Sequence, residues 1–193
     1  MPSVLRMTRI QILPEKQAIF ETILIQELAQ HHSLSAEYRP TIWVDVTNPD
    51  CYVSVRLFPS HEEIDDERQD EDFLKTRYPM YVATLAAPQE IVELNPREEV
   101  GSLFSRMPPV AFLSVSERIA APGFEKDLRE ETQLVLDSLE AIDGYLGGFV
   151  THREMLESEV FGFAFWSSYE AFLLSLPSPD HMIVTVKCYR RVV

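Results

Sequence analysis

Five side chains that could take part in chemistry fall on strand-like segments in the second half of this 193-residue chain. They are Ser114, Ser116, His152, Trp166 and Tyr189. Hydroxyl and indole groups can donate hydrogen bonds to an oxygen that gains negative charge, and a neutral imidazole can accept a proton. Alternation along a strand places Ser114 and Ser116 on one face. The residue types therefore suit a dry cavity that binds a flat aromatic ligand.

Roles follow from these residue types. We expect Ser116, His152 and Trp166 to act in catalysis, and Ser114, Trp166 and Tyr189 to bind the ligand. Two of them have structural alternatives. Trp166 could instead bury its ring in a core, which removes on the order of 200 Å² of surface from water, and His152 could be an exposed strand residue.

The elements that would position these residues occur twice in the chain. Residues 4–64 and 112–172 carry the same order of signals, about 108 positions apart. Each half opens with a strand-like run, passes through a proline into a helix, and reaches two strands of which the second ends in Phe58 or Trp166. A βαββαβ unit leaves one sheet face open, and duplication gives that face a partner. The pattern predicts an α+β fold of two tandem ferredoxin-like units around one barrel-like core.

Proline and glycine positions divide the chain into units. We expect an N-terminal unit over residues 1–95, a linker over 96–110 and a C-terminal unit over 111–193. Hydrophobic periodicity predicts the individual elements. The expected helices are 14–31, 73–86, 124–142 and one after Ser167, and the expected strands are 4–12, 40–46, 51–58, 89–94, 112–120, 147–155, 159–166 and 181–193.

Ser-x-x-Glu boxes mark the start of the second helix in each half. Ser60 with Glu63 and Ser167 with Glu170 have the spacing at which a serine side chain caps the helix. Gly144 follows the long helix of the second half and suits a left-handed conformation.

Net charge argues against two classes of partner. The chain has 17 basic and 31 acidic residues, which gives a net charge of −14. Nucleic acids and anionic membranes both attract basic surfaces, so neither is expected as a partner. The apolar runs are shorter than the roughly 20 residues that a membrane-spanning helix needs. A small molecule or a second copy of the chain is the expected partner.

The cysteines and the N-terminal segment indicate a compartment. Cys51 and Cys188 lie in different halves, and we expect two thiols in a reducing environment instead of a disulfide. Arg6 and Arg9 interrupt the first apolar run, which argues against a secretory signal. The expected location is the cytoplasm.

The second half resembles the antibiotic-biosynthesis-monooxygenase (ABM) domain of the dimeric α+β barrel superfamily, over residues 112–193. Three strings carry this resemblance: Ala-Pro-Gly at 121–123, Asp-Gly-Tyr-Leu-Gly-Gly at 143–148, and the strand that ends Phe-Ala-Phe-Trp followed by Ser-Ser-Tyr-Glu-Ala-Phe at 163–172. The first half fits the same fold by pattern, with Phe58 in the place of the tryptophan. In this family two chains pair their sheets, so one chain here would carry both halves and form a monomer or a homodimer.

The resemblance implies a cofactor-independent oxygenase that acts on an aromatic small molecule. An electron-rich phenol can donate an electron to O₂ when a pocket deprotonates it away from water. No metal is expected. A ligand carrier or interaction module on the same fold is the non-catalytic alternative.

Haem binding or degradation is the alternative that the superfamily offers. In its haem-degrading members such a tryptophan, a later histidine and an asparagine on the first strand line the haem site. Trp166 and His181 could take the first two roles, although His181 could also be a surface residue at the start of a strand. Ser116 or Glu117 stands in the place of the asparagine.

The site is expected in the second half, which keeps the tryptophan and the clearer family pattern. Trp166→Phe should then alter ligand binding more than Phe58→Leu.

The acidic run 61–72 lacks the spacing of a calcium loop, so we interpret it as a solvated loop or helix face. His31 and His32 are adjacent on a helix and point in different directions, which disfavours a shared metal ion. CxxC, GxSxG, P-loop and GxGxxG motifs are absent from the sequence.

Overall fold

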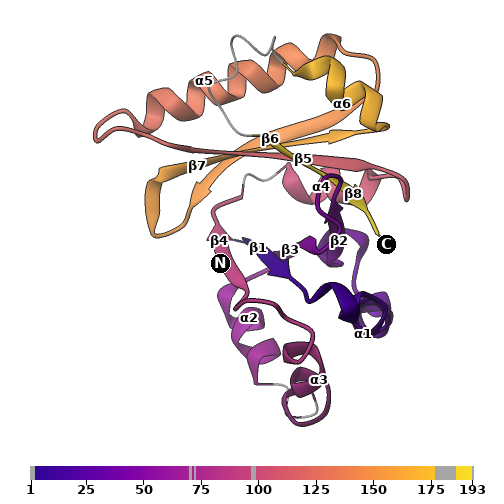
Figure 1. The fold of residues 1–193 in the computed structure, drawn as a ribbon. Helices are drawn as coiled ribbons and strands as arrows, with labels where there is room; N and C mark the ends of the chain where they lie inside the picture. The colour runs from indigo at the N-terminus through magenta and orange to yellow at the C-terminus, as the bar shows by residue number, and fades with distance from the viewer. Residues whose placement is uncertain (1–2, 70, 72, 97–98, 177–185, 193) are drawn as a thin grey trace. The chain divides into compact units, whose positions relative to one another are not determined.

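The computed structural model describes residues 3–69, 71, 73–96, 99–176 and 186–192. They form two compact units, Met1–Glu93 with Val192–Val193 and Leu94–Arg191. We call them the first and the second unit. Figure 1 shows the helices and strands of each.

The sheet of the first unit has the ferredoxin-like strand order β4-β1-β3-β2. Its strands are β1 (Val4–Gln11), β2 (Thr41–Asp45), β3 (Cys51–Phe58) and β4 (Glu90–Leu94). The central strand β3 pairs antiparallel with both β1 and β2. All four strands therefore fall on segments for which the alternating pattern predicted strands.

The helices of the first unit cover one face of this sheet. They are α1 (Gln17–Gln30), α2 (His61–Arg68) and α3 (Tyr78–Val82), with a π-helical segment at Phe73–Arg77 and short 3₁₀ segments at Pro14–Lys16, His31–Ser33 and Ala36–Tyr38. On α1, Phe20 and Leu24 are buried against Ile10, Ile42 and Tyr52 of the sheet. The apolar stripe of α1 thus sets its position above the strands.

The acidic run 61–72 begins as helix α2. Ser60 caps it, because its side chain accepts a hydrogen bond from the Glu63 backbone N–H at 3.4 Å, as the Ser-x-x-Glu box predicted. Ile64 is 1% exposed and packs with Val4 and Phe58. Most acidic side chains of α2 are exposed, so the interpretation as a solvated helix face holds for this helix, in which Ile64 is buried.

The second unit repeats this order of strands. Its strands are β5 (Phe112–Ile119), β6 (Tyr145–Arg153), β7 (Leu156–Trp166) and β8 (Val186–Arg191), and they follow the order β8-β5-β7-β6. Helices α5 (Glu125–Ser138) and α6 (Tyr169–Ser175) cover one face of the sheet, as Figure 1 shows, and a 3₁₀ turn at Leu139–Ala141 extends α5. Helix α5 is as long as α1, at 14 residues, and begins 108 positions later.

The segment predicted as a linker contains a helix, α4 (Val100–Arg106). Its Phe104 ring lies 5.8 Å from Phe165 and 6.3 Å from Phe149, measured between ring centroids. Both partners belong to the sheet face that α5 and α6 leave open. Helix α4 is therefore a packed part of the second unit, which begins at Leu94.

Two local predictions differ from the structure by small shifts. The cap of α6 is Ser168, which accepts from the Ala171 N–H at 3.1 Å, and not Ser167. Gly144 has a φ of 91°, as predicted, but it stands in the turn into β6 after the helix has ended. A Cβ atom there would lie 2.7 Å from Ser167 Oγ and 2.8 Å from Ala171 Cβ. The position therefore requires glycine both for its positive φ and for lack of space.

Each unit is thus a ferredoxin-like βαββαβ fold with its own core. The predicted fold class, α+β with two tandem ferredoxin-like units, is confirmed. Cys51 and Cys188, both of which the structure describes, are not joined in a disulfide.

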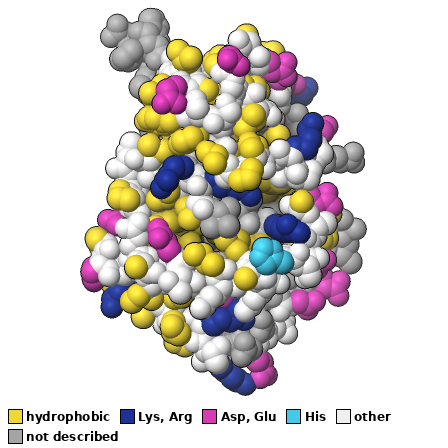
Figure 2. Space-filling view, turned by 90° about the vertical axis from the view of Figure 1, so that its right-hand side faces the viewer, with side chains coloured by type: hydrophobic (Ala, Val, Ile, Leu, Met, Phe, Trp, Pro, Cys, Tyr) yellow, Lys and Arg dark blue, Asp and Glu magenta, His cyan; other side chains and the backbone are white. Residues whose placement is uncertain are grey.

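One face of the molecule mixes both signs of charge. In the face drawn in Figure 2, acidic side chains are interspersed with basic ones and with apolar side chains. Among the residues that the structure describes, no helix combines the length and apolar character that crossing a membrane would require.

Candidate functional site

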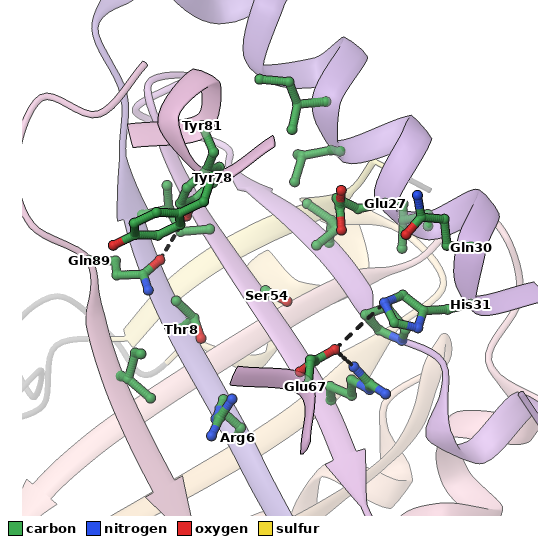
Figure 3. A pocket seen from close by; sticks show the side chains of 18 of the residues that line it. Arg6, Thr8, Glu27, Gln30, His31, Ser54, Glu67, Tyr78, Tyr81 and Gln89 are labelled. Atoms are coloured by element: carbon green, nitrogen blue, oxygen red, sulfur yellow. Dashed lines mark hydrogen bonds and ion pairs between the residues drawn. The ribbon is translucent and has the colours of Figure 1, made fainter. Parts of the chain in front are cut away.

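A cavity of about 450 Å³ lies within the first unit, between its sheet and the helices that cover it. Figure 3 shows side chains from β1, β3, α1 and α3 converging on this space. Cavities of roughly 300–1,000 Å³ are typical of small-molecule sites. The cavity is therefore large enough to hold a small aromatic molecule.

Alternate residues of β1 and β3 form the floor of the cavity. The register places Arg6 opposite Arg56, and Thr8 opposite Ser54. Ile10 continues the same face of β1, and all five side chains line the cavity. The floor therefore changes along β1 from cationic to hydroxylic to apolar.

Two arginines face each other across Phe58. The guanidinium carbon of Arg56 lies 4.2 Å from the centroid of the Phe58 ring, and that of Arg6 lies 5.1 Å from it. The side chains of Arg6 and Arg56 are 12% and 13% exposed. Like charges directly opposite each other on a sheet destabilise it, so this pair needs compensation.

Carboxylates supply part of that compensation. Arg6 Nη2 donates to Glu93 Oε1 at 3.0 Å, and Arg56 Nη1 pairs with Glu67 of α2. Arg56 Nε also donates to the Tyr38 carbonyl at 3.2 Å. Arg6 Nε, in contrast, is buried and has no hydrogen-bond acceptor among the described residues. Arg6 Nη1 makes no hydrogen bond among the described residues, so Arg6 keeps donor capacity.

His31 adds a proton acceptor to the same wall. It follows the last residue of α1, and its Nε2 lies 3.7 Å from Glu67 Oε1 (Figure 3). Burial, followed by the charge of Arg56, lowers the pKa of His31, and the nearby Glu67 only partly opposes this. The imidazole is therefore uncharged at neutral pH.

Tyrosine and aliphatic side chains complete the cavity. The Tyr81 hydroxyl donates to Gln89 Oε1 at 2.8 Å, and burial raises the pKa of Tyr81, so it stays protonated. The apolar lining includes Ile10, Ile23, Leu24, Leu28, Ile42, Leu74 and Ile91. The arrangement suits an apolar ligand that carries negative charge at one end.

The predicted residues of the second unit lie in a different environment. Trp166 is 1% exposed and Ser114 is 5% exposed, and Trp166 Nε1 donates to Ser114 Oγ at 3.0 Å. Trp166 belongs to the core cluster that includes Leu136 of α5 and Phe172 of α6. The structure thus brings Trp166 and Ser114 together inside a packed core.

The other predicted residues are not gathered around Trp166. Ser116 donates to the Gly162 carbonyl at 3.4 Å, and Tyr189 pairs with Leu113 in the register, so its side chain lies on the opposite sheet face from Ser114. His152 pairs with Val160, six residues along β7 from Trp166, which is a distance of about 20 Å at ~3.3 Å per residue. Burial and Arg129 lower the pKa of His152.

His181 lies outside the residues that the structure describes. The haem site implied by the family resemblance therefore rests on Trp166 and the first strand alone. Trp166 is enclosed between the sheet, α5 and α6, and Ser114 fills the position beside it. These residues do not fit a macrocycle at that place.

The residues that line the cavity were not among those predicted from the sequence. The sequence does contain a signal for Arg6 and Arg56. Each is a charged residue at an inward-facing position of a strand, and most of the other residues of that strand are buried. Glu67 sits in an acidic run, and His31 sits in a histidine pair, where neither stands out. Only the strand register shows that the two arginines face each other.

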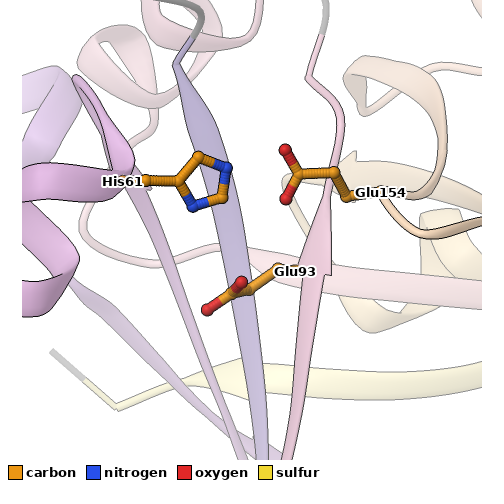
Figure 4. A group of neighbouring side chains, drawn as sticks. All are labelled: His61, Glu93 and Glu154. Carbon is orange, nitrogen blue, oxygen red and sulfur yellow. The ribbon is translucent and has the colours of Figure 1, made fainter.

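Figure 4 shows a further group of carboxylates and imidazole, namely His61, Glu93 and Glu154. His61 begins α2 and Glu93 lies on β4 of the first unit, whereas Glu154 belongs to the second unit. The group therefore does not make a site within either unit.

Comparison with known proteins supports the fold. No protein-family model matches the chain, and no curated protein sequence matches it. A solved structure of a candidate monooxygenase from Fusobacterium nucleatum matches with a TM-score of 0.72 at 8% identity, over 98% of this chain and 91% of that one. An anthrone oxidase-like protein matches with a TM-score of 0.69 at 12% identity, over 100% and 92%.

A third solved structure points to a different chemistry on the same fold. A candidate chlorite dismutase matches with a TM-score of 0.65 at 8% identity, over 100% of this chain and 96% of that one. Similarity at these identities establishes a shared fold and not a shared reaction. It confirms, as a likeness of fold, the resemblance that the sequence motifs indicated.

Proposed function

We propose that this protein is a cofactor-independent oxygenase of the ABM-like type, and that it binds an aromatic substrate in the cavity of the first unit. The observation that carries the proposal is the cavity itself, where two guanidinium groups and an uncharged imidazole line one largely apolar space. Solved structures with this fold include proteins named for oxygenase activity, which supports the reaction type.

Deprotonation of the substrate is the first step. His31 accepts the proton of a phenolic hydroxyl, because its lowered pKa keeps the imidazole free to do so at neutral pH. Arg56, whose charge also acts on His31, stabilises the phenolate electrostatically. The apolar walls limit water, which strengthens these interactions.

Electron transfer to O₂ follows without any bound cofactor. The phenolate gives one electron to O₂, and the resulting radical and superoxide combine to form a C–O bond at the ring carbon para to the hydroxyl. The His31 imidazolium protonates the peroxide. His31 then removes the ring proton as the O–O bond breaks, and the released hydroxide takes up that proton. One oxygen atom enters the quinone product, the other leaves as water, and O₂ receives four electrons.

Oxygen consumption tests the proposal. A panel of phenols that carry a hydrogen para to the hydroxyl is added to the protein in an oxygen electrode, and isotopically labelled O₂ shows where each oxygen atom goes. We expect equimolar O₂ uptake and quinone formation, with one labelled atom in the quinone and one in water. His31→Gln should lower the rate by about 10²–10⁴-fold, the usual contribution of a general base.

His32→Gln is the matched control, because His32 is exposed and does not line the cavity. It should keep the wild-type rate. Uptake no faster than in buffer for the whole panel would leave a ligand carrier as the better interpretation. A haem titration of the same protein separates the haem alternative, since a Soret shift at equimolar haem would contradict a cofactor-free site.

A further inference from the structure

The polarity of the cavity floor identifies the class of ligand more closely. Along β1, Arg6, Thr8 and Ile10 face the cavity in turn, and across from them on β3 stand Arg56 and Ser54. Inward residues of a strand are about 6–7 Å apart, so the floor runs from cationic to apolar over roughly 13 Å. A ligand that matches this floor has an anionic end, a hydroxyl near its middle and an apolar end.

Arg6 is the residue with capacity to bind the anionic end. Its Nη2 is occupied by Glu93 and its Nε is buried, whereas its Nη1 meets no acceptor among the described residues. A guanidinium N–H without an acceptor can form a charge-assisted hydrogen bond to an anion. An anion at the cationic end of the floor would supply an acceptor for Nη1.

Arg56 is committed to other partners. Its Nε donates to the Tyr38 carbonyl and its Nη1 pairs with Glu67. It contributes charge beside Phe58 but fewer open donors than Arg6. The anionic group of a ligand is therefore expected nearer Arg6, with the ring system extending toward Ile10 and Ile42.

We infer that the substrate class of this cavity is a hydroxylated aromatic carboxylate, held by its carboxylate at Arg6. The inference rests on the proposed function for the statement that this ligand is a substrate. The preference for a carboxylate is a property of binding alone. Thr8 and Ser54 then lie beside the ring hydroxyl, and the apolar residues of α1 cover the ring.

Calorimetric titration with two matched probes tests the inference. One probe is a dihydroxynaphthoate, and the other is the dihydroxynaphthalene that lacks the carboxylate. The wild-type protein should bind the carboxylate at least about tenfold more tightly, as a charge-assisted hydrogen bond to a buried arginine provides. In Arg6→Gln the two probes should bind within about twofold of each other, because the group that distinguishes them is gone.

Two further variants keep the test decisive. Arg9→Gln changes an arginine on the same strand that pairs with exposed Glu90 and does not line the cavity, so the preference should persist. Arg6→Gln combined with Glu93→Gln removes the ion pair without leaving a single buried charge, and thermal melting of each variant shows that it is folded. A preference that survives in both Arg6 variants would overturn the inference, as would equal binding of the two probes to the wild-type protein.

Oxygen uptake with the same probes separates this inference from the proposed function. A carboxylate preference that depends on Arg6, without O₂ consumption, would support the ligand class and contradict the oxygenase. O₂ consumption with the uncarboxylated probe at the same kcat/KM would support the oxygenase and overturn the ligand class.

Discussion

The two units place different residues at equivalent positions of the same sheet. Val4 pairs with Phe58 in the first unit, and Phe112 pairs with Trp166 in the second, so one register is kept 108 positions along the chain. At that register, Arg6 in the first unit corresponds to Ser114 in the second. One unit has a cavity above these positions, whereas the other has a packed core.

Side-chain volume and helix approach explain the difference. The Trp166 indole fills the space over the sheet in the second unit and donates its N–H to Ser114. Gly162 stands there in the place of Ser54, and a side chain at Gly162 would lie 3.1 Å from Thr132 of α5. The helix of the second unit therefore approaches its sheet closely. Fold symmetry does not impose symmetry of chemistry.

The largest expected effect comes from removing the Trp166 side chain from the packed core of the second unit. Trp166→Ala removes a fully buried ring, and we expect a loss of about 3–5 kcal/mol in the free energy of unfolding. Urea denaturation measures this loss. The affinity for a ligand in the first unit should change little, and a large loss of affinity in a variant that is still folded would show that the second unit binds the ligand.

The next effect comes from giving the first unit the residues of the second. Arg6→Ser, Arg56→Ala and Phe58→Trp together copy the second unit's residues onto this floor. We expect ligand affinity to fall by about 3 kcal/mol, because two charge-assisted contacts are lost. Titration with the naphthoate probe measures it. Unchanged affinity would mean that the cavity is not the binding site.

A smaller effect separates the two aromatic positions. Phe58→Leu should weaken binding by about 1 kcal/mol, since the ring between the guanidinium groups is lost. Trp166→Phe should leave binding within experimental error. The sequence predicted the reverse order, with Trp166→Phe altering binding more, so a titration of both variants decides between the two units.

The smallest effect concerns pH. The pKa of His31 is lowered in the folded chain, so its uncharged form persists below pH 6.5, where the unfolded chain already takes up a proton. Stability from this group is complete above pH 6.5 and declines as pH falls toward the folded pKa. The rate of O₂ uptake should fall over the same acidic range. His31→Gln should flatten the stability profile.

Hydrophobic period and capping signals predicted most elements correctly. The helix at 14–31 appears as α1 with short 3₁₀ turns at both ends, and Ser60 caps α2 as predicted. Helix α4 was missed because Pro96 and the later prolines indicated a linker. Local signals determine where elements begin, and they carry no information on packing across the sheet.

The cavity could not be predicted from the same signals. An arginine within a strand does not reveal which cation it will face, because this depends on register over some fifty residues of chain. Trp166, a rare residue type, was predicted to be a site residue. In the structure its large side chain instead fills the core of the second unit. Rarity of a residue type therefore indicated core packing here and not the location of an open site.

The shared register of the two units also affects how such a chain can change over generations. In an assembly of two identical subunits, every substitution is present twice, so an opened cavity weakens both halves at once. In a tandem chain, Arg6 and Arg56 can open one half while Trp166 keeps the other solid. The second unit thereby keeps its stability while substitutions accumulate in the first. New ligand specificities should therefore arise first around Phe58.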